Sequence, residues 1–185
     1  MKVLTLDNQA FFGHCVELEA KIKKDFQPDL ILGILHGGGK VAENLFCELP
    51  HTFVSLRRPS TEKKEKSGLI MRFVNSLPVI IKDGLRICEA RLLSLKQKKT
   101  IRQIHIDGAM FENRTHVLVV DDAVDSGVTM KSVLDAISKS SRDLIIRSAV
   151  ITVTTKNPIL LPDYFLYHNQ TLIRFPWSKD NQAGK

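Results

Sequence analysis

Three carboxylates at the end of an apolar run are the side chains of this sequence best suited to chemistry. Residues 117–120 are apolar and mostly β-branched, which predicts a buried parallel strand ending in acids. Asp121 and Asp122 follow directly, and Asp125 comes shortly after them. Such acids at a strand end can accept hydrogen bonds from neutral hydroxyls or bind a divalent cation. The sequence therefore predicts a polar ligand here.

The residues after the acids are suited to an anion. They are Ser126, Gly127, Val128 and Thr129, and a helical apolar pattern runs from Val128 to about residue 137. Backbone N–H groups of such a loop and of the helix start can surround a phosphate, and Gly127 permits close approach because it has no Cβ. A sugar phosphate would satisfy both halves, with phosphate in the loop and ribose hydroxyls on the acids.

A second glycine-rich turn follows another apolar run, residues 30–35. It consists of His36, Gly37, Gly38, Gly39 and Lys40, and a helix is expected from there to about residue 47. The glycines permit positive φ and expose consecutive amides, which predicts a second anion site. Open α/β sheets bind ligands at the carboxyl ends of their strands, where both turns would lie.

The remaining pattern supplies further elements around these turns. A helix is expected over residues 8–25, capped by Asn8, with an apolar stripe of Phe11, Cys15, Leu18 and Ile22. Strands are expected over residues 52–56, 101–106 and 144–154, and two short ones around a polar turn within 164–174. A helix is expected over residues 84–98.

Composition narrows the class of protein. A length of 185 residues is most simply one domain, 1–185, and 43% hydrophobic with 25% charged residues is typical of a soluble globule. No apolar run approaches the roughly 20 residues that span a bilayer, and the start is too soon charged for a signal peptide. The three widely spaced cysteines indicate reduced thiols in the cytoplasm. The net charge of +7 suits a substrate with several phosphates, since no aromatic-interleaved basic patch supports nucleic acid.

The stretch 117–129 resembles the phosphoribosyl-pyrophosphate (PRPP) binding motif of the type I phosphoribosyltransferases. That motif is an apolar strand, two acids, then an acid, Thr or Ser, Gly, any residue and Thr. Within this family, residues 117–129 are most similar to the purine-salvage branch, which comprises the hypoxanthine and xanthine–guanine phosphoribosyltransferases. Two other motifs fail: haloacid-dehalogenase-type phosphatases need acids at alternate positions, which Ala123 breaks, and a Walker A loop needs Ser or Thr where Val41 stands.

The resemblance implies an α/β fold, a mostly parallel twisted sheet flanked by helices, with a small hood from the terminal segments. It implies that a ring nitrogen displaces pyrophosphate from PRPP with Mg²⁺ bound. Asp121 and Asp122 would hold the ribose hydroxyls and the metal, and Ser126, Gly127, Val128 and Thr129 the phosphate. Asp125 would act as general base toward the purine.

The resemblance also implies residues for pyrophosphate and base. Pyrophosphate would lie against His36, Gly37, Gly38, Lys40, Arg57 and Arg58, and a polar lid over residues 57–68 would close on it. Many members carry Arg or Lys where this chain has His36, so either His36 or Lys40 would supply the charge. Lys156 would contact the oxygen of a 6-oxopurine, and Trp177 would stack on the base.

Alternatives remain open at this point. A PRPP-sensing regulator of the same fold would bind without turnover, and the acceptor could be a pyrimidine or a non-base group. PRPP synthetase carries a similar motif but has two domains, and this chain is too short for it. The expected partners are PRPP and a purine base, with no nucleic acid and no membrane, and a homo-oligomer, a dimer by family resemblance, in the cytoplasm.

Overall fold

The structure, a computed structural model, describes residues 2–55, 104, 106–141, 143–169 and 171–178. The chain divides into two compact units, residues 1–56 with 99–185, and residues 57–98. The second unit lies outside the described residues, as do Arg57 and Arg58, the predicted lid, the helix predicted over 84–98 and most of the strand predicted over 101–106. The prediction of one domain over 1–185 therefore stays a prediction.

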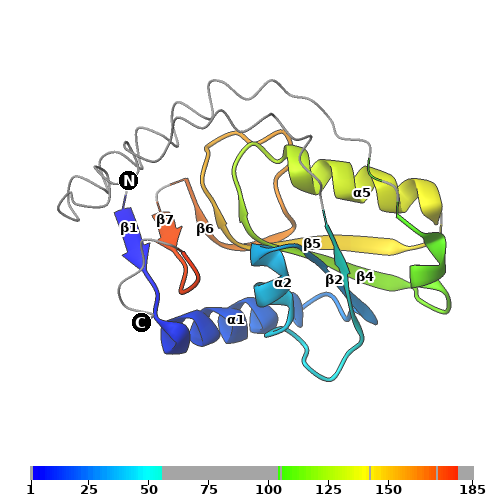
Figure 1. Ribbon diagram of the computed structural model, residues 1–185, viewed down its shortest axis with the longest axis horizontal. Coiled ribbons are helices and arrows are strands. Elements are labelled where there is room, and N and C mark those ends of the chain that lie inside the picture. Colours follow the sequence, from blue (N-terminus) through cyan, green and yellow to red (C-terminus); the bar gives the residue numbers. More distant parts are fainter. Residues whose placement is uncertain (1, 56–103, 105, 142, 170, 179–185) are drawn as a thin grey trace, which may run out of the picture. The chain divides into compact units, whose positions relative to one another are not determined.

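A five-stranded parallel sheet forms the centre of the first unit (Figure 1). Its strand order is β3-β2-β4-β5-β6, and each neighbouring pair is parallel. The strands are β2 (Leu30–Ile34), β3 (His51–Val54), β4 (His116–Val124), β5 (Ile145–Val153) and β6 (Tyr164–His168). This confirms the predicted mostly parallel sheet, and it brings the carboxyl ends of β2 and β4 to one edge as neighbours.

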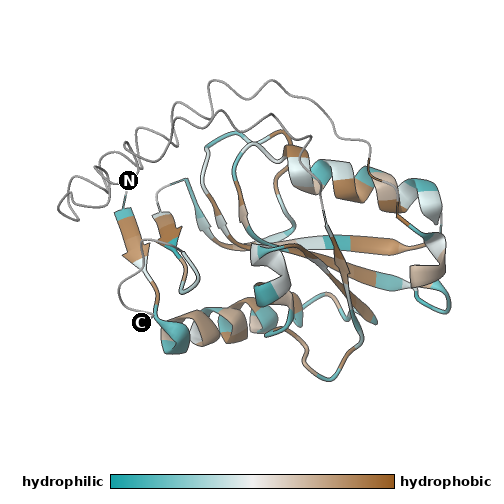
Figure 2. Cartoon of the chain, viewed as in Figure 1, coloured by the Kyte–Doolittle hydropathy of each residue, from teal (hydrophilic) through white to brown (hydrophobic). Residues whose placement is uncertain are grey.

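Helices cover both faces of this sheet, and its central strands are largely hydrophobic (Figure 2). These strands bury apolar side chains on both faces, which explains why both faces are covered. One core contains Ile31 and Leu118 and packs against α1 (Asn8–Ile22) and α2 (Gly37–Ala42). The other contains Leu32 and Val119, the neighbours in sequence, and packs against α5 (Val128–Ser140) and the 3₁₀ turn η1 (Gly108–Phe111). No described helix is long and apolar enough to cross a membrane.

The two terminal segments form a small sheet of their own. Strand β1 (Lys2–Thr5) pairs in parallel with β7 (Thr171–Arg174), and the Leu6 amide donates to the Arg174 carbonyl at 2.9 Å. The predicted hood of terminal segments is therefore present. The two short strands expected within 164–174 both exist, but β6 joins the large sheet and β7 joins the small one.

Several predicted element boundaries were wrong, because a capping side chain or a neighbouring strand sets where the element begins or ends. The helix α1 is capped by Asp7, whose carboxylate accepts from the Ala10 amide at 2.7 Å, and not by Asn8, and it ends at Ile22. Its predicted apolar stripe is buried, as expected. Strand β4 does not stop before the acids but continues to Val124, because β5 provides ladder partners for Asp121, Ala123 and Val124.

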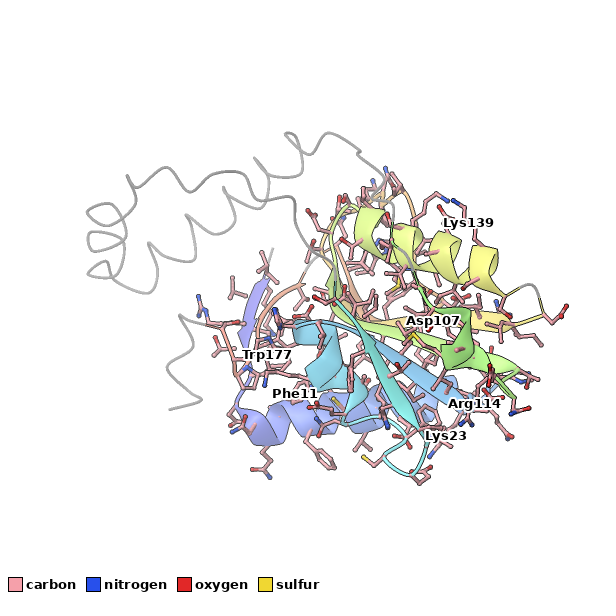
Figure 3. The ribbon with its side chains drawn as sticks, turned by 45° about the vertical axis from the view of Figure 1, so that its right-hand side comes forward. Phe11, Lys23, Asp107, Arg114, Lys139 and Trp177 are labelled. Atoms are coloured by element: carbon pink, nitrogen blue, oxygen red, sulfur yellow. The ribbon has the colours of Figure 1, made fainter. Side chains whose placement is uncertain are left out.

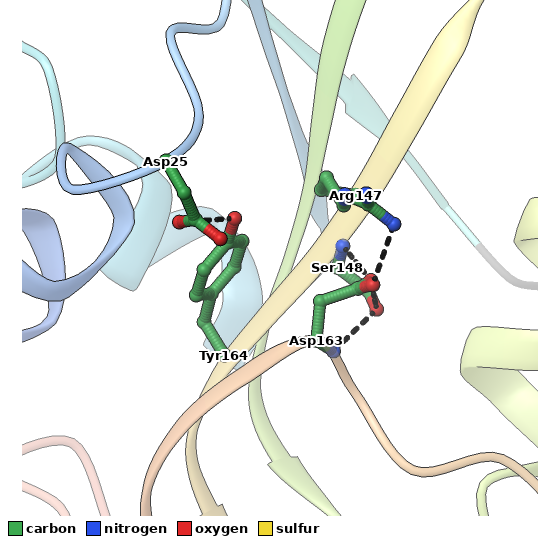
Figure 4. Close-up of polar contacts among 5 residues, drawn as sticks. All are labelled: Asp25, Arg147, Ser148, Asp163 and Tyr164. Atoms are coloured by element: carbon green, nitrogen blue, oxygen red, sulfur yellow. Dashed lines mark hydrogen bonds and ion pairs between the residues drawn. The ribbon is translucent and has the colours of Figure 1, made fainter.

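A polar cluster fixes the amino end of β6 on β5 (Figure 4). The Asp163 carboxylate accepts from the Ser148 amide at 2.8 Å, from the Ser148 hydroxyl at 2.7 Å and from Arg147 at 3.1 Å. The Tyr164 hydroxyl donates to Asp25 at 2.9 Å, which ties the same strand start to the end of α1. These contacts set the register of the edge strand from the end opposite to the acid pair.

Asp29 fastens the segment before β2 to the start of β4. Its carboxylate accepts from the Thr115 amide at 2.7 Å, the Thr115 hydroxyl at 2.9 Å and the His116 amide at 3.1 Å. Burial by itself would raise the pKa of Asp29, but these hydrogen bonds lower it below its usual value. When the pKa of a carboxyl is lower in the folded than in the unfolded state, its ionised form stabilises the fold. This stabilisation is fully present at pH values above the pKa of the unfolded state, and it is lost as the pH falls through the pKa of the folded state.

We expect Asp29→Ala to lower the free energy of unfolding by about 1–3 kcal/mol near neutral pH, because three donors lose their acceptor. The deficit relative to wild type should be constant from about pH 7 to pH 5 and should shrink near pH 3. Urea unfolding at these pH values measures it. Asp135→Ala is the control, since that carboxylate only pairs with partly exposed Lys131 and should cost less than about 1 kcal/mol. A deficit that grows toward pH 3 would contradict this assignment.

Candidate active site

The amino end of α2 lies directly against the acid pair on β4. A Cβ on Gly38 would stand 2.6 Å from the Val120 carbonyl oxygen and from the Asp121 Cα, and a Cβ on Gly37 would overlap the Asp122 carboxylate. A side chain at position 38 would therefore displace the backbone of β4, and one at position 37 would displace the Asp122 carboxylate. The glycine turn and the acids, which lie far apart in the sequence, therefore form one site at the carboxyl edge of the sheet.

The glycines serve close approach and not unusual backbone angles, which corrects the expectation from sequence. Gly37, Gly38 and Gly39 belong to α2 itself, and Gly127 is the only described glycine with a positive φ, 80°. The helix begins at the first glycine, so the predicted open turn does not precede it. The Leu35–His36 peptide bond just before α2 is cis. His36 is the exposed cap residue of α2, and its side chain makes no capping hydrogen bond.

The acid pair is largely desolvated, and this decides its electrostatics. Burial raises the pKa of Asp121 well above its usual value, and the neighbouring Asp122 charge raises it further. Burial also raises the pKa of Asp122, although hydrogen bonds, from Asp121 first and from the Trp177 side chain among others, act to lower it. The Asp122 amide donates to Asp121 Oδ1 at 2.9 Å, and the Gly38 amide also bonds this carboxyl. Two adjacent carboxyls in this state favour a ligand that brings hydroxyl donors or positive charge.

The carboxylates of the acid pair can hold Mg²⁺ only together with a bound ligand that supplies further oxygen atoms. Within the described residues there is no group of three or more His, Cys, Asp or Glu side chains that could hold a metal ion. Mg²⁺ commonly takes one or two carboxylates and completes its shell with substrate phosphates and water. Asp121 and Asp122 supply that number of carboxylates, so the residues present fit a metal that arrives with a phosphorylated substrate.

The predicted phosphate loop turns between β4 and α5 with a defined shape. Gly127 has φ 80° and caps α5, and its carbonyl accepts from the Lys131 amide at 2.9 Å. A Cβ there would stand 2.8 Å from the backbone of Leu160, so a second segment confines the loop. Ser126 and Thr129 are half-buried at this turn. The first amides of α5 and these two hydroxyls follow the acid pair closely in the chain, and their role in binding phosphate stays a prediction.

Asp125 and Lys156 lie on the two connections that meet at this edge. The Asp125 carboxylate accepts from the Thr154 hydroxyl at 3.1 Å, directly after β5. Lys156 is exposed on the connection between β5 and β6, and its carbonyl accepts from His168 at 3.2 Å. Sequence reasoning did not single out Thr154, because it fell inside the strand predicted over residues 144–154, whereas β5 ends at Val153 and leaves Thr154 at the edge of the sheet.

Trp177 belongs to an aromatic cluster that joins the C-terminal segment to α1 and α2 (Figure 3). Its ring is stacked on Phe175 at 4.8 Å and 9°, and Phe11 meets it edge-on at 5.0 Å. The Lys40 ammonium lies 5.7 Å from the indole ring centroid. Phe175 covers one face of the indole and the Lys40 ammonium lies over the ring, so a base that stacked on Trp177 would have to displace one of these two side chains. The Trp177 side chain also hydrogen-bonds the Asp122 carboxyl, and the stacking role of Trp177 stays a prediction.

Comparison with known proteins agrees with this fold. Residues 5–178 match the phosphoribosyl transferase domain family. Among solved structures, xanthine-guanine-hypoxanthine phosphoribosyltransferase of Helicobacter pylori superposes with a TM-score of 0.62 at 18% identity over 97% of this chain and 95% of that one. Purine phosphoribosyltransferase of Pyrococcus horikoshii Ot3 gives 0.59 at 18% identity over 97% and 96%. A hypothetical protein of Neisseria gonorrhoeae with bound ppGpp gives 0.55 at 21% identity over 95% and 89%. No curated protein matches the chain.

Proposed function

Because this chain belongs to the phosphoribosyl transferase domain family, we propose that it transfers the 5-phosphoribosyl group of PRPP to a purine base and releases pyrophosphate. The observation that carries the proposal is the fit of Gly37 and Gly38 against Asp121 and Asp122. It unites a helix start suited to pyrophosphate with acids suited to ribose, beside a loop suited to the 5-phosphate.

The sugar half of PRPP would be held by the end of β4 and the start of α5. The amides of residues 126–129, with the hydroxyls of Ser126 and Thr129, would bind the terminal phosphate. Asp121 and Asp122 would accept hydrogen bonds from the ribose hydroxyls, which relieves the cost of burying two carboxylates. These acids would also hold Mg²⁺ together with substrate oxygens, and the bound metal neutralises the charge of the leaving pyrophosphate.

Pyrophosphate would lie at the start of α2. The Gly37 amide and the Lys40 ammonium of α2 would be the donors there, and the Gly38 amide, which bonds the Asp121 carboxyl in the ligand-free site, would have to exchange that partner. Positive charge would come from Lys40 or His36, and from Arg57 and Arg58, which lie outside the described residues. The bond from the anomeric carbon to pyrophosphate breaks as a purine ring nitrogen bonds to that carbon. The ring N–H proton of the purine then passes to the Asp125 carboxylate.

A 6-oxopurine is the favoured acceptor. The exposed Lys156 ammonium is a donor only, so it suits the acceptor oxygen of hypoxanthine, guanine or xanthine. Adenine carries an amino group at that position, which also donates. Sites built to bond one group reject an analogue without it by up to about 10⁴-fold.

A second candidate is a PRPP-binding regulatory protein of the same fold without turnover, and a different acceptor is a third. The Neisseria gonorrhoeae protein supports the binding of purine and pyrophosphate groups by such a fold, since ppGpp carries both. The presence of separate candidate groups for the base, Asp125 and Lys156, favours an enzyme over a regulator. Family resemblance further supports a homodimer acting in the cytoplasm.

Pyrophosphate release with PRPP, Mg²⁺ and a panel of hypoxanthine, guanine, xanthine and adenine tests the proposal. We expect turnover with at least one 6-oxopurine and little with adenine. Lys156→Ala should cut this preference by roughly 10-fold or more, because the ammonium that selects the oxygen is gone. Lys139→Ala, an exposed lysine in the last turn of α5, is the matched control and should leave the preference unchanged. Binding of PRPP without release on any base would instead favour the regulator.

A further inference from the structure

Thr154 connects the end of β5 to the end of β4 through both its backbone and its side chain. Its amide donates to the Val124 carbonyl at 2.8 Å. Its hydroxyl lies 3.1 Å from Asp125 Oδ1 and 3.4 Å from the Val124 carbonyl oxygen. A hydrogen bond to an ionised acceptor is roughly twice as strong as one between neutral groups. The nearer carboxylate is therefore the main acceptor of this hydroxyl.

The same connection is held to the phosphate loop at a second point. The Ile159 amide donates to the Ser126 carbonyl at 2.9 Å, and the backbone of Leu160 packs against Gly127. Lys156 stands between these two attachments. Its position relative to Asp125 is thus set by local hydrogen bonds on both sides, in addition to the pairing of β4 with β5.

A 6-oxopurine presents its imidazole nitrogen and its exocyclic oxygen side by side, so an acid and an amine that read both must keep a fixed spacing. A carboxylate on a short side chain turns about its χ angles unless a partner holds one oxygen. An error of about 1 Å in such positioning can cost on the order of 10²-fold in rate. Thr154 has the placement to prevent this, since it bonds Asp125 and precedes Lys156 by two residues.

We infer that Thr154 is a positioning residue for the base half of the site. Its hydroxyl holds Asp125 Oδ1, which leaves Oδ2 to accept the proton of the purine in register with Lys156. The inference rests on the proposed function and deepens it, because it names how the general base is oriented. Thr154 itself touches neither PRPP nor the purine.

Thr154→Val tests this, because it keeps the side-chain shape and removes the hydroxyl. We expect kcat with hypoxanthine to fall about 10-fold, while the Kd for PRPP with Mg²⁺ stays within about twofold of wild type. Thr154→Ser, which restores the hydroxyl, should recover kcat to within about threefold. Ser138→Ala is the control for loss of a hydroxyl, since Ser138 bonds only the Leu134 carbonyl on the exposed side of α5.

A double-mutant cycle gives the sharper result. In the Asp125→Asn background, Thr154→Val should lower kcat by less than about twofold, because the hydroxyl acts only through that carboxylate. A further 10-fold loss in that background, or unchanged kcat in Thr154→Val alone, overturns the inference. So does an equal loss of PRPP affinity. A wild-type protein that turns over no purine overturns the proposed function itself, which distinguishes the two failures.

Discussion

Asp125→Asn is expected to lower kcat by about 10²–10⁴ while PRPP still binds with nearly the affinity of wild type. Removing a general base typically costs a rate factor of this size. The acid lies beyond the pair on β4, and its described side-chain partner is the Thr154 hydroxyl on the connection that carries Lys156. We therefore expect it to act on the base and not on the ribose.

Steady-state kinetics with hypoxanthine and calorimetry with PRPP and Mg²⁺ separate these two effects. Asp135→Asn is the matched control, because Asp135 is a half-exposed acid on α5 that pairs with Lys131. Its kcat should stay within about twofold of wild type. A variant of Asp125 that loses PRPP affinity as much as it loses kcat would assign this acid to the sugar, and an unchanged kcat would remove it from the mechanism.

Gly38→Ala is expected to destabilise the fold by about 2–3 kcal/mol and to abolish PRPP binding. The added methyl would meet the Val120 carbonyl oxygen and the Asp121 Cα at 2.6 Å. Both are backbone atoms of a central strand, so neither can rotate away as a flexible side chain would. The start of α2 would have to move from the acid pair, which separates the two halves of the site.

Gly13→Ala is a control for which we expect the opposite change in the free energy of unfolding. Gly13 lies within α1 and is exposed, and among the described residues no atom beyond its chain neighbours and the backbone of its own helix lies within 4 Å of where its Cβ would be. Alanine there should stabilise by roughly 0.5–1 kcal/mol, because glycine is unfavourable inside a helix. Gly38 is also helical, so helix propensity alone predicts the same gain for it. Denaturant unfolding of both variants shows whether helix propensity or the contact with β4 determines the effect at Gly38. A stabilised Gly38→Ala protein would contradict the close packing of α2 on β4.

The central motif was predictable because local residues define it. The apolar run before Asp121, and the acid, small residue and glycine at residues 125–127, predict a strand, an anion loop and a helix. The strand and the helix are present, and anion binding by the loop stays a prediction. The end of the strand was not predictable. The acids interrupt the apolar pattern, but β5 continues to pair with the chain as far as Val124, and that partner lies in a distant part of the sequence.

The role of the glycines shows the same limit more sharply. The sequence indicates that residues 37–39 need freedom from a side chain, and conformational freedom is the usual reason. The structure shows that β4, through Asp121, Asp122 and the Val120 carbonyl, takes the space at Gly37 and Gly38, and that the side chains of Leu35 and Phe53 take the space at Gly39. The aromatic neighbours of Trp177 are equally non-local, since Phe11 comes from the first helix and Trp177 from the C-terminal segment. Contacts of this kind leave no periodic signal in one sequence.

Calorimetric titration of PRPP into wild type, Asp121→Asn and Asp122→Asn, with and without Mg²⁺, tests the central claim most directly. We predict Mg²⁺-dependent binding to wild type and at least about 10-fold weaker binding to each variant, because charge-assisted bonds to ribose and metal are lost. The ligand-free Asp121→Asn protein should melt no lower than wild type, since the fold raises the pKa of Asp121 and its ionisation costs stability at neutral pH. Weaker binding by a variant of undiminished stability is the predicted result. Unchanged PRPP affinity in both variants would contradict the assignment of this site.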